Sequence, residues 1–98
     1  METKRRLALM IDGDNAQATL IGPIMAAVSQ FGEITIRRVF GDWTSPHMNS
    51  WKDPLNIHAL QPAQQFSYTT GKNSTDSALI IEAMDLLYTA EIDGFCIV

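Results

Sequence analysis

The sequence predicts an α/β fold, a three-layer α/β/α sandwich built on a parallel sheet. Short runs of apolar and β-branched residues alternate along the chain with segments whose apolar residues recur at helical spacing. The first run, Leu7–Ile11, is apolar at every position, which is typical of a strand buried on both faces of a parallel sheet. Strands that alternate with helices pair in parallel through right-handed crossovers, so helices are expected on both faces.

The first half of the chain carries two predicted strands and two predicted helices. The strand at 7–11 ends at a turn signal over 12–15. The residues that predict an amphipathic helix after it, closed by a glycine cap, are Leu20, Ile24, Val28, Phe31 and Gly32. Residues 34–40 supply a second strand, ended by Gly41 and Asp42. Ser45 and Pro46 then fit the start of a short helix whose apolar face comprises Met48, Trp51 and Leu55.

The second half of the chain carries two further strands and one long helix. A third strand is predicted over 57–60, followed by a polar surface loop over 61–73. The helix predicted over 75–89 has Asn73 or Ser74 as its cap, and its apolar residues are Leu79, Ala83 and Leu86 or Leu87. A fourth strand is predicted over 95–98.

Length and composition describe one domain, residues 1–98. The chain has 98 residues, of which 46% are hydrophobic and 18% charged, as in an ordinary globular protein. Its formal net charge of −4 argues against a protein that coats nucleic acid with a positive field, so any such contact must be local. A single cysteine, no signal peptide and no long apolar span predict a cytoplasmic protein without a membrane segment. The apolar run Gly94–Val98 has no cap after it, so we expect the domain to be incomplete at its C-terminus.

Three acidic residues are expected at the carboxyl edge of the sheet, where open parallel sheets bind their ligands. Asp12 directly follows the first strand, Asp14 lies in the same turn, and Asp76 lies in the first turn of the helix at 75–89. Converging carboxylates repel one another unless a cation lies between them, and their oxygens suit Mg²⁺ or Mn²⁺. Such a metal activates water and neutralises a phosphodiester. As alternatives, residues 12–15 are also a common turn, and Asp76 also complements the helix dipole.

Aromatic and basic residues interleave in two segments of the chain. Single-stranded nucleic acids are bound by such sets, because bases stack on aromatic rings while cations contact phosphates. The set comprises Arg37, Arg38, Trp43, His47, Trp51, Lys52, Phe66, Tyr68 and Lys72. Packing is the competing explanation, above all for Trp51 and Phe66.

Three segments together resemble one known family. They are Leu9-Met10-Ile11-Asp12-Gly13-Asp14-Asn15, Arg38-Val39-Phe40-Gly41-Asp42-Trp43-Thr44-Ser45-Pro46, and a segment over 69–88 that begins Thr69-Thr70-Gly71-Lys72-Asn73-Ser74-Thr75-Asp76. From about Leu7 to Val98 the chain resembles the NYN domain of the LabA-like (DUF88) proteins, which are PIN-like ribonucleases. The resemblance implies a Rossmann-like sheet of strand order 3-2-1-4 and a carboxylate cluster that binds Mg²⁺ or Mn²⁺ and hydrolyses RNA.

The resemblance also implies roles for single residues. Asp12 and Asp76 match metal-binding acids, Asn15 matches the polar residue that follows the first acid, and these three are the expected catalytic residues. Lys72 and Asn73 match the approach to the second acid. Together with Trp43 and Arg38 from the aromatic and basic set, they are the residues expected to contact RNA. Relatives continue the fourth strand into a Ser-Ser-Asp-Ser-Asp-Phe type segment with further acids, so this chain is expected to be weakly active or inactive by itself.

The leading hypothesis is a metal-dependent ribonuclease acting on RNA, single-stranded by expectation, with Asp12, Asp76 and Asp14 as metal ligands. The alternative is a non-catalytic RNA-binding or assembly module with the same fold. A third hypothesis is a phosphatase, because the turn after the first strand also resembles the nucleophile loop of haloacid-dehalogenase-like enzymes, although Ala16 stands where Thr or Val is expected. An exposed apolar edge at the last strand makes a homo-oligomer a further expectation.

Overall fold

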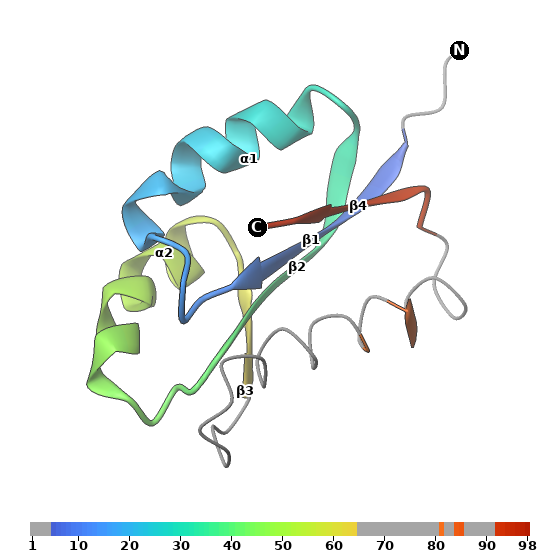
Figure 1. Cartoon of the computed structure of the whole chain (residues 1–98). Coiled ribbons are helices and arrows are strands. Elements are labelled where there is room, and N and C mark those ends of the chain that lie inside the picture. Colours follow the sequence, from blue (N-terminus) through green and yellow to red (C-terminus); the bar gives the residue numbers. More distant parts are fainter. Residues whose placement is uncertain (1–4, 65–80, 82–83, 86–91) are drawn as a thin grey trace.

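The computed structural model of the chain describes residues 5–64, 81, 84–85 and 92–98 (Figure 1). Its elements are β1 (Arg6–Asp12), the 3-10 helix η1 (Ala18–Leu20), α1 (Ile21–Ser29), β2 (Glu33–Gly41), the 3-10 helix η2 (Pro46–Trp51), α2 (Lys52–Ile57), β3 (Gln61–Gln64) and β4 (Gly94–Ile97). The strands predicted at 7–11, 34–40 and 95–98 are confirmed, as are the two helices of the first half. The bounds predicted for the first helix are wrong, because Leu20 and Phe31 lie outside α1 and are exposed, and its C-cap is Gln30 and not Gly32. The helix predicted over 75–89 lies outside the described residues, apart from the helical and exposed Ile81, Met84 and Asp85. No helix in the described part of the chain is long and apolar enough to cross a membrane.

The four strands run parallel in one sheet of order β3-β2-β1-β4, which confirms the predicted α/β class and strand order. β1 is central and pairs with β2 along its whole length, up to Asp12 opposite Phe40. β4 lies on the other side of β1, where the Asp12 N–H donates to the Val98 carbonyl at 2.9 Å and the Val98 N–H donates to the Met10 carbonyl at 3.0 Å. The strand order therefore reverses between β1 and β4. Ligands of open parallel sheets bind beyond the carboxyl ends of the strands at such a reversal.

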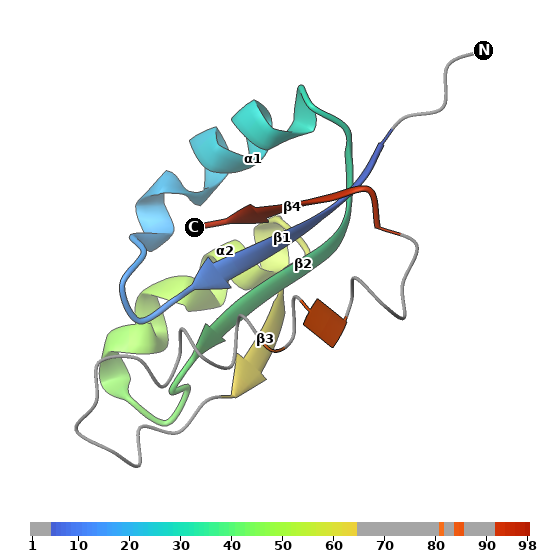
Figure 2. The ribbon, with the colours of Figure 1, turned by 45° about the vertical axis from the view of Figure 1, so that its right-hand side comes forward.

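Both faces of β1 are buried, which explains its unbroken apolar run. α1 and the η2–α2 segment lie on the same side of the sheet (Figures 1 and 2). The core on this side includes Leu7, Leu9, Ile11, Ile21, Val28, Val39, Met48 and Trp51. The core on the opposite side is centred on Ala8, Met10 and Phe40. Because successive strand side chains point to opposite faces, alternate residues of β1 serve the two cores. Each large apolar side chain buried in this way contributes about 1.5–3 kcal/mol.

The third strand lies further along the chain than predicted. The prediction of a strand over 57–60 is wrong, because α2 continues to Ile57 and β3 occupies Gln61–Gln64. The prediction of a surface loop over 61–73 is correspondingly wrong for its first four residues.

The end of α2 explains this shift. Ala59 has a φ of 53°, in the left-handed region, and the Leu60 N–H donates to the Leu55 carbonyl at 3.0 Å. This is the pattern of a Schellman turn, which ends a helix and which glycine usually makes. Leu60 is buried in the core cluster that Leu55 also packs against. Leu60 is therefore apolar because it packs at the end of the helix, and not because it belongs to a strand. β3 itself is a polar edge strand, where a proline such as Pro62 is tolerated.

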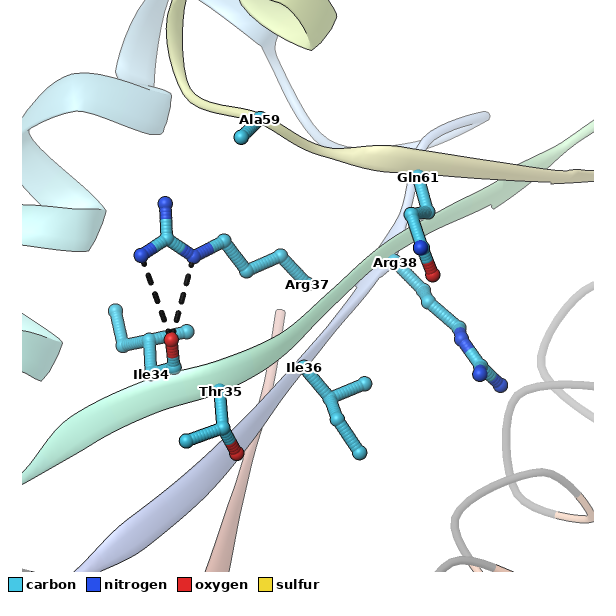
Figure 3. Close-up of a pocket in the computed structure, with 7 residues that line it drawn as sticks. All are labelled: Ile34, Thr35, Ile36, Arg37, Arg38, Ala59 and Gln61. Atoms are coloured by element: carbon cyan, nitrogen blue, oxygen red, sulfur yellow. Dashed lines mark hydrogen bonds between the residues drawn. The ribbon is translucent and has the colours of Figure 1, made fainter.

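Arg37 lines a pocket of about 500 Å³ beside the short third strand (Figure 3). β3 pairs only with Arg38–Gly41, so the earlier part of β2 has no strand on that side within the described residues. The Arg37 guanidinium donates to the Ile34 carbonyl through Nε and Nη2, at 3.4 Å each, and to the His58 carbonyl through Nη1 at 2.8 Å. Figure 3 shows Arg37 and Arg38 on opposite sides of the strand. Arg37 was expected on a surface that contacts a partner, and the structure instead uses it to bind two backbone carbonyls.

Candidate functional site

Asp12 ends the central strand at the point where the strand order reverses. Its side chain is buried, with 8% exposed. The Asn15 amide Nδ2 donates to Asp12 Oδ2 at 2.6 Å, and the N–H groups of Asn15 and Ala16 donate to the Asp12 carbonyl at 3.2 and 2.8 Å. The turn therefore holds both the backbone and the carboxylate of Asp12. The structure therefore brings the side chains of Asp12 and Asn15, two of the predicted site residues, into contact.

Gly13 allows this turn to approach the end of β2. Its N–H donates to the Phe40 carbonyl at 2.7 Å. A Cβ at this position would lie 2.6 Å from Val39 Cγ1, 2.9 Å from Met48 Cε and 3.0 Å from the Phe40 carbonyl oxygen. Val39 is fully buried and its β-branched side chain is stiff, so it has little room to move. The glycine therefore lets the turn hold Asp12 close to the sheet.

Asp14 is directed toward the loop that follows β2. Its Oδ1 lies 2.9 Å from His47 Nε2 and accepts the Asp42 N–H at 3.4 Å. The Ser45 hydroxyl lies 2.8 Å from the other ring nitrogen of His47, Nδ1. Asp14 therefore links the turn after β1 to the start of η2, a contact that its neighbourhood in the sequence does not reveal.

The carboxyl end of β2 supplies a further acid, Asp42, which the sequence prediction did not select. Its Oδ1 accepts hydrogen bonds from the Thr44 hydroxyl at 2.5 Å, the Thr44 N–H at 3.1 Å and the Gln64 amide at 3.0 Å. The Thr44 hydroxyl, followed by the Gln64 amide, lowers the pKa of Asp42 below its usual 3.8. Asp12 was selected because it is a carboxylate directly after a strand. Asp42 also directly follows a strand, so the same criterion could have identified it.

The two tryptophans have different surroundings. Trp43 lies at the carboxyl edge and is partly buried; its indole N–H donates to the Ala63 carbonyl at 3.1 Å and its backbone N–H to Gln64 Oε1 at 3.0 Å. Trp51 is 1% exposed and its indole N–H donates to the Gly13 carbonyl at 3.1 Å. The packing explanation of Trp51 is therefore confirmed. Trp43 is held at the edge where the sequence predicts a nucleic-acid contact.

The structure does not bring all of the predicted site residues to this edge. Arg38 is partly buried in the middle of β2, opposite Met10 and three residues before the strand ends. Asp76, Lys72 and Asn73 lie outside the described residues. Within the described ranges, no group of three or more His, Cys, Asp or Glu side chains is arranged to hold a metal ion.

Comparison with known protein families matches one family model, the NYN domain, over residues 6–98. Comparisons with curated proteins and with solved structures found no match. The matched range contains all four strands of the sheet and the turn that holds Asp12. The match covers almost the entire chain, and the parallel sheet agrees with it. The chain therefore belongs to the NYN domain family and has a PIN-like α/β fold.

Proposed function

We propose that this NYN domain is a metal-dependent ribonuclease that hydrolyses phosphodiester bonds of single-stranded RNA. The observation that carries the proposal is Asp12, a buried carboxylate directly after the central strand, with one oxygen held by the Asn15 amide at 2.6 Å. It lies where the strand order reverses, which is the usual ligand site of such sheets. Membership of the NYN family supports a ribonuclease-like domain. The motifs favour the LabA-like (DUF88) branch of the family.

The chemistry of this carboxylate fits Mg²⁺ or Mn²⁺. Both ions prefer oxygen ligands, and Mg²⁺ is usually bound through one or two carboxylates, with water and substrate phosphate completing its shell. We propose that Asp12 and Asp76 hold the ion, and that Asp14 is a further ligand. Asp14 already accepts hydrogen bonds at Oδ1, but a carboxylate has about four lone-pair sites, so these contacts are compatible with ligation.

The bound metal would supply an activated water and neutralise charge on the phosphodiester. Asn15 holds the Asp12 carboxylate in one orientation through its 2.6 Å hydrogen bond, and groups of this kind tune metal sites from outside the ligand shell. Trp43, fixed by two hydrogen bonds, offers an indole ring on which a base can stack, worth roughly 1–3 kcal/mol. The groups proposed to contact phosphates are Lys72, Asn73 and Arg38.

The test replaces Asp12 by asparagine, with Asp53→Asn as the matched control, because Asp53 is exposed on α2. We expect Asp12→Asn to lower Mn²⁺-dependent cleavage of end-labelled single-stranded RNA by about 100-fold or more, and Asn15→Ala to lower it by about 10–100-fold. Mn²⁺ binding measured by titration calorimetry should weaken in Asp12→Asn and stay unchanged in Asp53→Asn.

Cleavage that survives unchanged in Asp12→Asn would refute the assignment of this site. A wild-type protein that binds RNA but neither binds Mn²⁺ nor cleaves RNA would favour the alternative, a non-catalytic RNA-binding module.

A further inference from the structure

A cleft of about 370 Å³ lies beside the turn that follows β1. One wall is the chain from Gly13 to Thr19, and the other is η2. Its polar lining comprises Asp14, Gln17, Thr19, His47 and Ser50. Volumes of about 300–1,000 Å³ are typical of sites for small ligands, so the cleft is large enough for one nucleoside.

The floor of this cleft is well packed. Trp51 lines it with an almost fully buried side chain, and its indole N–H is bonded to the Gly13 carbonyl. Ala16 and Ala18 leave room between the two walls because their side chains are small. The cleft is therefore a preformed feature of the fold, held open by the packing of η2 against the turn.

The lining of the cleft favours a ligand that carries hydroxyl groups. No lysine or arginine is among its lining residues in the described part of the chain. Its carboxylate, Asp14, lies 2.9 Å from His47 Nε2. Gln17, Thr19 and Ser50 carry amide and hydroxyl groups that both donate and accept hydrogen bonds, which suits the hydroxyl groups of a sugar.

The cleft and the Asp12 carboxylate lie on different sides of the same sheet edge. Alternate residues of a strand point to the same face of the sheet, so Asp12 lies on the same face of β1 as Met10 and Ala8. The cleft opens on the opposite face, where η2 lies. A nucleic-acid strand held at Asp12 that crosses this edge would place a neighbouring nucleoside in the cleft. The scissile phosphate would stay at Asp12.

We infer that this cleft binds a ribonucleoside of the substrate strand next to the cleavage site and reads its 2′-hydroxyl through Ser50, Thr19 and Gln17. The inference rests on the proposed function and deepens it, since it names ribose as the feature that the domain selects. The 2′-hydroxyl is both a donor and an acceptor and distinguishes RNA from DNA. The cleft is lined by groups that also donate and accept, so they can pair with this hydroxyl, whereas a deoxyribose would leave them unpaired.

The test measures binding in EDTA, so that neither metal binding nor cleavage contributes. Fluorescence anisotropy compares a labelled RNA oligonucleotide with the DNA oligonucleotide of the same sequence. We expect the wild type to bind the RNA about fivefold more tightly, as expected for one or two hydrogen bonds. Ser50→Trp, which fills the cleft from an exposed position, should lower RNA affinity to the DNA level. Asn49→Trp, exposed on the same helix and outside the lining, should preserve the preference.

Equal affinity of the wild type for the two strands, or a preference that survives in Ser50→Trp, would overturn the inference. If circular dichroism shows that Ser50→Trp is unfolded, Thr19→Val replaces it as the test, because it is a smaller change at an exposed position. Thr19→Val should also reduce the preference for RNA over DNA. A protein that cleaves RNA with Mn²⁺ but binds both strands equally keeps the proposed function and loses this inference. The opposite result is an RNA preference in the wild type together with cleavage that is unchanged in Asp12→Asn. It would support the nucleoside cleft and refute the proposed nuclease site.

Discussion

Replacing Trp51 by phenylalanine tests how η2 is held against the turn of the candidate site. Trp51 is 1% exposed, packs in the core on the helical side of the sheet and donates its indole N–H to the Gly13 carbonyl at 3.1 Å. Phenylalanine keeps an aromatic ring but removes this donor. The carbonyl that loses its partner belongs to a buried residue directly after Asp12.

The cost follows from these two losses. A buried carbonyl left without a hydrogen bond costs about 1–3 kcal/mol. The smaller ring leaves a cavity, which adds on the order of 1 kcal/mol. We therefore expect Trp51→Phe to lower the free energy of unfolding by about 2–4 kcal/mol. Since domains of this size have roughly 5–15 kcal/mol in total, the loss would be a large part of the stability.

Trp43→Phe is the matched control, because it removes an equivalent hydrogen bond to the Ala63 carbonyl at the edge strand β3. Trp43 is only partly buried and water can replace the lost donor, so we expect a loss of only about 0.5–1.5 kcal/mol. Urea denaturation followed by circular dichroism measures both variants. A loss for Trp51→Phe equal to or smaller than that for Trp43→Phe would refute the reasoning.

Two further predictions concern the residues around the sheet edge. Gly13→Ala should lower the free energy of unfolding by about 1–3 kcal/mol, because its Cβ would lie 2.6 Å from Val39 Cγ1; an unchanged melting temperature would contradict the close approach. The pKa of Asp42, measured by NMR titration, should lie below 3.8 and rise in Thr44→Val, which removes the hydroxyl donor. Because the folded pKa is the lower one, this stabilisation is present above pH 3.8 and is lost as the pH falls through the folded pKa. The stability difference between wild type and Thr44→Val should therefore shrink on acidification, and a difference that grows would contradict this account.

The central part of the fold could be predicted because burial leaves a clear sequence pattern. Leu7–Ile11 is buried on both faces and therefore reads as an unbroken apolar run. β3 leaves no such pattern, because Gln61–Gln64 is held by backbone pairing with β2 at the edge of the sheet. The helix end that precedes it uses Ala59 in a conformation that glycine usually adopts, so no residue type marked the boundary.

The contacts of the candidate site differ in how far they span the chain. Asn15 lies three residues from Asp12, so a single turn brings their side chains into contact. Asp14 and His47 are 33 residues apart, and only the folded chain brings them together. The functional roles of all the predicted site residues stay predictions, as does the homo-oligomer. The residues are Asp12, Asp14, Asn15, Arg38, Trp43, Lys72, Asn73 and Asp76.

Arg37 also affects how the sheet can meet other polypeptides. A bare strand edge is a template onto which another chain can add and start aggregation. Beside β3, the Ile34 carbonyl already accepts two hydrogen bonds from the Arg37 guanidinium. An incoming strand would have to break these bonds and bury the cation. Arg37 therefore makes the part of β2 that β3 does not cover a poor place for another strand to add.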